Sequence, residues 1–259
     1  ILADKEEIKL QPNQYVMLVS NSNDKKTALA RFFNYNEPLM KMYKMENVWG
    51  IDARNKEQSF ALELLMDPDV EVVSLIGQAG SGKTLLAVAA GLEQVLGEEQ
   101  QYKKLIVSRP VQPLGKDIGF LPGTLEEKMD PWLMPIKDNL EFLMGNDRDM
   151  VKTYFEQGVI EIEAITYIRG RSITNAFIII DEAQNLTRHE LKTILTRVGE
   201  GTKIILTGDI EQIDNIYIDE TSNGLTYAVE KFKEYDISGH ITLQKGERSK
   251  VATLAAKIL

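Results

Sequence analysis

The chain has 259 residues, of which 43% are apolar, 39 are acidic, 30 are basic and none is cysteine. That length suits one large α/β domain with a small attachment, and the lack of thiols excludes disulfides and thiolate metal sites. The net charge of −9 disfavours a protein that clamps nucleic acid over its whole surface, so any such binding is expected to be local.

Cellular location is also constrained by the sequence. No apolar run approaches the length of about 18 residues that a membrane span needs, so no membrane association is expected. The absence of cysteine fits the reducing cytoplasm. The chain begins at Ile1 with no basic start before an apolar signal core, so we expect a cytoplasmic protein that is a piece of a longer chain.

The first 48 residues differ from the rest. Residues 15–20 (Y-V-M-L-V-S) predict a short strand and residues 21–26 a polar turn, while residues 26–33 suit either a strand or a short helix. We therefore expect a small β-rich appendage or linker at residues 1–48, followed by a main domain at residues 49–259.

From residue 51 onward, helical and strand patterns alternate. Helices are predicted at 56–66, 83–96, 188–198, 222–232 and 251–259, and strands at 71–76, 104–108, 177–180, 203–206 and 239–243. Short, wholly apolar strands between helices indicate a mostly parallel sheet covered on both faces, in an order typical of a three-layer RecA-like P-loop NTPase fold. Residues 111–146, with four prolines, interrupt the alternation and are predicted to be an elaborate insertion.

A phosphate-binding pattern follows the first strand of this domain. Residues 77–84 (G-Q-A-G-S-G-K-T) match G-x-x-x-x-G-K-[ST] in every fixed position, between a predicted strand and a predicted helix. The glycines let backbone amides turn toward phosphate oxygens, and the helix adds the positive end of its dipole. Lys83 is expected to reach the β- and γ-phosphates, and the Thr84 hydroxyl to ligate magnesium. The residues predicted to hold the nucleotide are Gly77, Gln78, Ala79, Gly80, Ser81, Gly82, Lys83 and Thr84.

Two acids end a later strand. The four apolar residues 177–180 lead into Asp181 and Glu182, and the carboxyl ends of buried parallel strands are where ligands bind in such sheets. Asp181 is predicted to hold the magnesium ion and Glu182 to orient and deprotonate the attacking water. A solvated strand end with two ordinary acids is the alternative, and the intact P-loop on the same predicted sheet favours the functional interpretation.

A third strand also ends in polar residues. Residues 203–206 are followed by T-G-D and then Gln212, and G-D-x-x-Q resembles the third motif of superfamily 1 helicases. In that interpretation Asp209 and Gln212 sense the γ-phosphate and link its hydrolysis to movement. The alternative is a turn with a helix cap.

An amide side chain precedes the P-loop strand. Residues 55–58 (N-K-E-Q) resemble the glutamine motif of the same helicases. The amide of Gln58 could donate to adenine N7 and accept from its amino group, which would favour ATP over GTP. The polar face of an amphipathic helix is the alternative.

Four arginines are candidates for stabilising the charge that develops on the γ-phosphate. Arg248 lies in a segment that resembles a phosphate-contacting helicase element. Arg169 and Arg171 precede the acidic strand and could reach RNA or a neighbouring subunit, as could Arg109. Solvated arginines paired with surface acids are the alternative.

Taken together, these motifs resemble the PhoH-like ATPase family. The resemblance covers residues 48–259 and rests on the P-loop, S-R-P at 108–110, G-F-L-P-G at 119–123, R-G-R at 169–171, I-I-D-E-A-Q-N at 179–185 and T-G-D-I-x-Q-I-D at 207–214. It is strongest to the branch in which an N-terminal PIN ribonuclease domain precedes the ATPase. That branch implies cytoplasmic bacterial proteins that form rings and unwind and cut RNA. No PIN domain fits within residues 1–48, so such a domain is expected only in a longer chain, and nuclease activity is not carried over.

The length of the chain limits the comparison with helicases. Superfamily 1 helicases have two RecA-like domains and this chain has room for one, so ATP-driven movement of RNA would need neighbouring subunits. We therefore predict a homo-oligomeric ring, such as a hexamer. Lys116, Lys128, Trp132 and Lys137 in the insertion could touch an RNA strand, or Trp132 could lie in a core.

Three functions are compatible with the motifs. The first is Mg-dependent ATP hydrolysis coupled to RNA binding or remodelling. The second is a nucleotide-gated assembly or adapter ATPase without unwinding activity. A small-molecule kinase ranks last, because no lid-like arginine cluster or acceptor site is visible.

Overall fold

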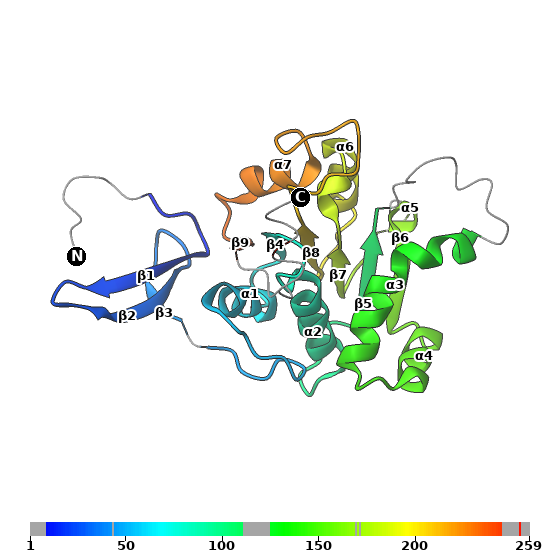
Figure 1. Cartoon of the computed structure of the whole chain (residues 1–259), viewed down its shortest axis with the longest axis horizontal. Helices are drawn as coiled ribbons and strands as arrows, with labels where there is room; N and C mark the ends of the chain where they lie inside the picture. The colour runs from blue at the N-terminus through cyan, green and yellow to red at the C-terminus, as the bar shows by residue number, and fades with distance from the viewer. Residues whose placement is uncertain are drawn as a thin grey trace.

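The computed structural model describes residues 9–42, 44–110, 125–168, 170, 172–244 and 254. It contains two sheets (Figure 1). A three-stranded antiparallel sheet comprises β1 (Gln14–Ser20), β2 (Asn23–Phe32) and β3 (Met40–Lys41). The ambiguous segment at residues 26–33 is therefore a strand, and the turn before it is shorter than predicted because β2 already begins at Asn23.

The main sheet has six strands in the order β6-β5-β7-β8-β4-β9, and every pairing is parallel. The strands are β4 (Val72–Gly77), β5 (Lys104–Arg109), β6 (Ile160–Ala164), β7 (Ala176–Ile180), β8 (Lys203–Gly208) and β9 (Ser238–Leu243). β8 lies between the P-loop strand β4 and the acidic strand β7. The expected RecA-like P-loop NTPase fold, with a small N-terminal β-rich sheet, is confirmed.

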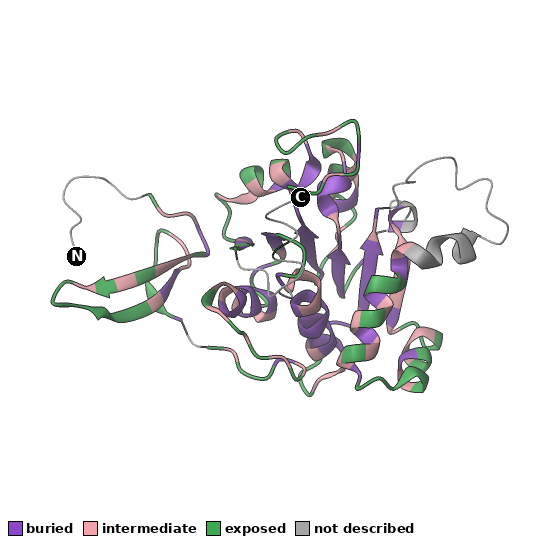
Figure 2. Cartoon of the chain, in the orientation of Figure 1, coloured by how far each residue is buried: buried purple, intermediate pink, exposed green. Residues whose placement is uncertain are grey.

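Helices cover both faces of the sheet, which explains why its strands are apolar throughout. Along β7, Phe177 and Ile179 belong to one core cluster, while Ile178 and Ile180 belong to the other. The first cluster includes α1 (Lys56–Met66), α2 (Lys83–Leu96) and α3 (Leu125–Leu143), and the second includes α6 (Arg188–Leu195) and α7 (Gly224–Phe232). Figure 2 shows the strands buried between these two layers.

The segment predicted to be an irregular insertion differs most from expectation. Residues 125–143 form the 19-residue helix α3, followed by α4 (Arg148–Glu156) and by β6, which extends the sheet beside β5. Leu133, Ile136 and Leu140 are buried in the core that α3 shares with α2, so packing offsets the helix-breaking effect of the prolines. The first part of the segment, residues 111–124, and the terminal helix predicted at 251–259, apart from Leu254, lie outside the described residues.

The antiparallel sheet is joined to the main domain by a buried cation. Arg31 of β2 is 2% exposed, lies 2.7 Å from the carboxylate of Asp67, and receives further support from Glu63 at 3.6 Å. Its guanidinium also donates to Asn13 Oδ1 at 2.6 Å. Because Glu63 and Asp67 stand at the end of α1, the base of the small sheet is attached to that helix.

Aromatic stacking and backbone capping reinforce this attachment. The ring of Tyr15 stacks on Phe60 of α1 with centroids 4.4 Å apart. Asn13 Nδ2 donates to the carbonyl oxygens of Asp236 and Ser238, the latter at the start of β9. The β1–β2 hairpin then extends away from the main domain (Figure 1). Within the part of the chain that the structure describes, no helix has the length and apolar character required to cross a bilayer.

Candidate nucleotide-binding site

The P-loop connects the end of β4 to the start of α2, as predicted. Gly80 and Gly82 have φ angles of 80° and 91°, a left-handed conformation that favours glycine. A Cβ atom at Gly77 would come within 2.5 Å of the Leu243 carbonyl oxygen, so glycine is needed there for close packing against β9. The loop therefore needs glycine at two positions for its backbone conformation and at one for close packing.

The side chain of Lys83 folds back onto the start of the P-loop. Its Nζ donates to the carbonyl oxygens of Gly77 at 2.5 Å and Gln78 at 3.1 Å. The ammonium group thus lies within the turn whose amides and helix terminus form the anion-binding feature. Its predicted contact with the β- and γ-phosphates stays a prediction.

Thr84 and Asp181 come together although 97 residues separate them. The Thr84 hydroxyl donates to Asp181 Oδ1 at 2.8 Å, and the Thr207 hydroxyl donates to the same oxygen at 2.5 Å. Asp181 is only 5% exposed. A hydroxyl and a carboxylate are hard oxygen donors of the kind Mg²⁺ prefers, and this ion usually takes few protein ligands, so the pair fits the predicted magnesium site.

Glu182 is held in a strained and specific position. Its φ of 53° and ψ of 38° are left-handed, which is unusual for a residue other than glycine. Arg109 Nη2 donates to Glu182 Oε1 at 3.0 Å, and Gln184 Nε2 donates to Oε2 at 2.6 Å. Arg109, predicted to contact RNA or a neighbouring subunit, therefore pairs with Glu182 inside its own chain.

Gln184 is a site residue to which the sequence analysis assigned no role. It is fully buried, and besides Glu182 its amide nitrogen donates to the carbonyl of Gln212 at 2.9 Å. Its Oε1 accepts from the backbone N–H of Asp209 at 3.1 Å. Gln184 lies in the I-I-D-E-A-Q-N motif, but that motif does not show what the side chain contacts, and only its position between the ends of β7 and β8 shows that it links them.

Asp209 and Gln212 meet the P-loop and the acids in different ways. Asp209 Oδ2 accepts from the Ala79 N–H of the P-loop at 3.0 Å, and Oδ1 accepts from the Glu211 N–H at 3.1 Å. Asp209 thus supports the P-loop and caps the turn that follows β8. Gln212 is exposed and is tied to the site through its backbone carbonyl.

Gln58 contacts the P-loop itself. Its Nε2 donates to the Ser81 carbonyl at 3.1 Å, and its Oε1 accepts from the Arg54 N–H at 2.9 Å. Both ends of the amide are therefore engaged within the chain, and the side chain is 6% exposed. Adenine recognition by Gln58 remains a prediction and would require exchange of these bonds.

Three predicted arginines, Arg169, Arg171 and Arg248, lie outside the described residues, as does Lys116. The side chain of Lys128 is likewise not described. Trp132 is half-buried in α3, and its carbonyl oxygen lies 3.4 Å from Arg109 Nη1. The site assembled in the described residues thus consists of the P-loop, the β7 acids, Arg109, and the turn after β8.

Comparison with known proteins agrees with this geometry. The family described as PhoH-like protein matches residues 50–258. The chain belongs to the PhoH-like family. It is a P-loop NTPase, and the resemblance inferred from its motifs is confirmed.

Two relatives show how much of a PhoH-like protein this chain represents. It is 53% identical to Protein PhoH2 of Bacillus subtilis (strain 168) over 253 residues, which is 96% of this chain and 57% of that protein. It is 42% identical to Protein PhoH2 of Thermobispora bispora over 213 residues, which is 82% of this chain and 48% of that protein. The chain therefore spans about half the length of the curated relatives it matches.

Among solved structures, a crystal structure of Pif1 helicase from Candida albicans aligns with a TM-score of 0.41 and 16% identity, covering 80% of this chain and 43% of that chain. This similarity adds nothing to the fold established above.

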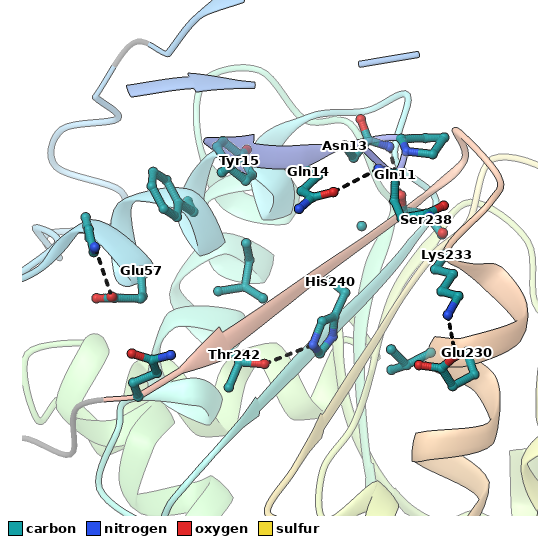
Figure 3. A pocket seen from close by; sticks show the side chains of 17 residues that line it. Gln11, Asn13, Gln14, Tyr15, Glu57, Glu230, Lys233, Ser238, His240 and Thr242 are labelled. Carbon is teal, nitrogen blue, oxygen red and sulfur yellow. Dashed lines mark hydrogen bonds and ion pairs between the residues drawn. The ribbon is translucent and has the colours of Figure 1, made fainter. Parts of the chain in front are cut away.

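The PhoH-like chain also has a cavity of about 530 Å³ beside the edge strand β9 (Figure 3). Side chains from the N-terminal segment, α1, α7 and β9 line it, among them Tyr15, Glu57 and Lys233. His240 points into it and hydrogen bonds Ser74 and Thr242. As far as the described residues go, the lining includes no P-loop residue, so the cavity is separate from the candidate nucleotide site.

Proposed function

We propose that this chain binds ATP with magnesium and hydrolyses it, and that an oligomer of the chain couples the hydrolysis to binding or remodelling of RNA. The observation that carries the ATPase proposal is the convergence of Thr84 and Asp181, 2.8 Å apart, beside the loop closed by Lys83. Asp209 of the third motif also accepts from the Ala79 N–H of the P-loop at 3.0 Å. Three motifs distant in sequence thus meet at one end of the sheet with the chemistry that a metal-bound triphosphate requires.

The residues of the site divide the work. The P-loop amides and Lys83 bind the phosphates, and Thr84 and Asp181 would hold magnesium, which neutralises developing charge when bound. Glu182 lies next to Asp181 and accepts the proton of the attacking water. Gln184 and Arg109 orient the Glu182 carboxylate through the two bonds described above.

Coupling to RNA is supported by the contact between α3 and the hydrolytic residues. Trp132 of α3, one of the residues predicted to touch a strand, contacts Arg109, which in turn holds Glu182. An RNA strand that displaced α3 would therefore change the orientation of the Glu182 side chain. One RecA-like domain per chain also favours an oligomer, since strand movement needs two such domains that change their relative position.

An ATPase assay with and without RNA tests the coupling. We expect turnover of Mg-ATP in the absence of RNA and stimulation by single- or double-stranded RNA, measured on protein whose mass in solution is known. Turnover that is unchanged across a panel of RNAs would leave the ATPase and remove the RNA coupling. A change in mass on adding nucleotide without RNA stimulation would instead favour the nucleotide-gated assembly.

A further inference from the structure

The β1–β2 hairpin presents an apolar face that nothing in the described chain covers. Met17, Val19 and Met40 are 50%, 46% and 47% exposed. Met17 of β1 lies opposite Leu29 of β2, and Met40 of β3 lies opposite Arg31, two residues after Leu29. Because side chains alternate along a strand, these residues point to one side of the sheet. We call Met17, Val19, Leu29 and Met40 the overhanging face. Figure 2 shows the hairpin as a mixture of exposed and intermediate residues.

The small sheet is basic although the chain as a whole is acidic. Exposed lysines at positions 9–44 outnumber the exposed acids, which are Asp24 and Glu37. Lys25 and Lys26 stand at the outer end of the hairpin, next to the overhanging face. Lys25, Lys26 and Lys41 lie in the strands, Lys9 precedes them, and Lys44 follows them and pairs with Glu46 at 3.8 Å.

A second patch has the opposite charge. Ile216 and Tyr217 are 87% and 84% exposed, more than any other large apolar side chain in the described residues. They lie in residues 211–220, which we call the acidic loop. It contains four exposed acids and no lysine or arginine, the acids being Glu211, Asp214, Asp219 and Glu220.

The acidic loop is held in a defined shape. Asn185 Oδ1 accepts from the Asp214 and Asn215 N–H groups at 2.8 and 3.3 Å, and Asn215 Nδ2 donates back to the Asn185 carbonyl at 3.0 Å. Asp219 caps the far end through the N–H groups of Thr221 and Ser222. Two large apolar side chains on a rigid loop lose little conformational entropy on binding, which is typical of an interface.

These two patches suit each other and lie on different elements of the molecule. Because their surfaces differ, each copy could use its loop on one neighbour and its hairpin on the other, which is a head-to-tail contact that closes into a ring when the rotation allows. The four acids disfavour contact of the loop with an RNA backbone. We propose that the acidic loop of one copy of this chain binds the overhanging face of the next copy, with Ile216 and Tyr217 against Met17 and Val19.

This contact would reach the hydrolytic residues of the copy that contributes the loop. The loop is bonded to Asn185, and Gln184 is bonded to the carbonyl of Gln212 within it. A shift of the loop caused by a neighbouring copy would therefore move Gln184 and Asn185, which follow the two acids in sequence. The inference rests on the oligomer of the proposed function and specifies its interface.

The absence of cysteine in the chain allows a direct cross-linking test. Thr27→Cys places a thiol opposite Val19 on the hairpin, and Glu220→Cys places one on the acidic loop, while all four apolar contact residues are kept. A short bismaleimide should link a mixture of the two single variants into dimers, and should link the double variant into a ladder. Glu156→Cys, exposed on α4, replaces either partner as the control and should give no product.

Charge reversal tests the same pairing without a cross-linker. Lys25→Glu/Lys26→Glu and Asp214→Lys/Glu220→Lys should each raise the dissociation constant of the oligomer at least about tenfold, because each brings like charges together. Mixing the two variants restores opposite charges at both contacts, so an alternating oligomer should form again. Glu98→Lys/Glu99→Lys changes the charge by the same amount as the loop variant at another exposed site. It should leave the dissociation constant of the oligomer unchanged.

The outcomes separate this contact from the wider proposal. Oligomers that form without the predicted cross-links, or that the mixture fails to restore, overturn the contact but leave the oligomer. A monomer at all concentrations, measured by light scattering with and without Mg-ATP, overturns both. If the lysine reversals weaken RNA binding and leave the dissociation constant of the oligomer unchanged, the hairpin is an RNA surface and the proposed contact is wrong. RNA stimulation of the ATPase is measured separately on the unaltered chain.

Discussion

Arg109 and Glu182 form an ion pair across two neighbouring strands, with Arg109 Nη2 and Glu182 Oε1 3.0 Å apart. Both side chains are partly buried, so the pair is screened less than a surface salt bridge. The positively charged guanidinium of Arg109 lies beside the carboxylate that we propose removes a proton from water. The ion pair therefore orients the carboxylate, which makes Arg109 a positioning residue.

The first prediction concerns this pair. Glu182→Gln should bind Mg-ATP normally and lower kcat about 100-fold or more, the range expected for loss of a general base. Arg109→Ala should lower kcat by a smaller factor with little change in KM, and Arg109→Lys should recover part of it. Adding Arg109→Ala to Glu182→Gln should cost nothing further, since the two act as a unit. Additive losses in steady-state assays would show that Arg109 acts elsewhere, for example on RNA.

Lys83 offers the most direct test of nucleotide binding. Lys83→Ala should raise the Kd for Mg-ATP about ten- to a hundredfold, because a charge-assisted hydrogen bond to phosphate is lost. Titration calorimetry measures this directly. Lys56→Ala removes an exposed lysine outside the P-loop and should leave the affinity unchanged. Equal affinities for the Lys83 variant and the unaltered chain would contradict the proposed site.

Gln58 distinguishes support of the P-loop from recognition of the base. Its amide bonds the Ser81 carbonyl and the Arg54 N–H, so Gln58→Ala should weaken ATP and GTP binding by similar factors. Loss confined to ATP would show instead that the amide reads adenine, as the sequence motif suggests. Competition binding with both nucleotides on one preparation gives the ratio without depending on absolute activity.

Local patterns in the sequence predicted a large part of this structure. The bounds of α1 and α2 agree with the predicted ones because their caps, apolar spacing and following turn are all local signals. The meeting of Thr84 and Asp181 could also be anticipated, since parallel strands bring their carboxyl ends to one edge. These features need only short-range pattern and the general topology of parallel sheets.

Features that depend on strand order were not predictable. The Arg109–Glu182 pair exists because β5 and β7 are neighbours, and no local pattern reveals that. α3 was missed because Pro131 and Pro135 usually end helices, and its stability comes from tertiary burial of Leu133 and Ile136. Arg31 was likewise unremarkable in sequence, and only the fold shows it buried between two acids.

The attachment of the small sheet leads to a stability prediction. Arg31→Met should lower the free energy of unfolding by about 3–5 kcal/mol, because it leaves Glu63 and Asp67 without their buried cation. Burial already raises the pKa of Glu63, and Arg31 opposes that rise. Lys44→Ala, which breaks an exposed pair with Glu46, should cost at most about 1 kcal/mol. Urea unfolding measures both; comparable losses would contradict a structural role for Arg31.

His240 predicts a dependence of stability on pH. Burial lowers the pKa of His240 to about 4 by desolvation, whereas an unfolded histidine has a pKa near 6.5. Between these two pH values the unfolded state binds a proton at this position and the folded state does not. Its contribution to stability is therefore complete above pH 6.5 and is lost as the pH falls from about 6.5 to about 4. The urea concentration at the unfolding midpoint should decrease when the pH is lowered from 7 to 5, and His240→Gln should reduce that decrease. His189→Gln, exposed on α6, is the matched control and should leave the decrease unchanged. If the His240 variant loses as much stability as the unaltered chain over this range, the titrating group lies elsewhere.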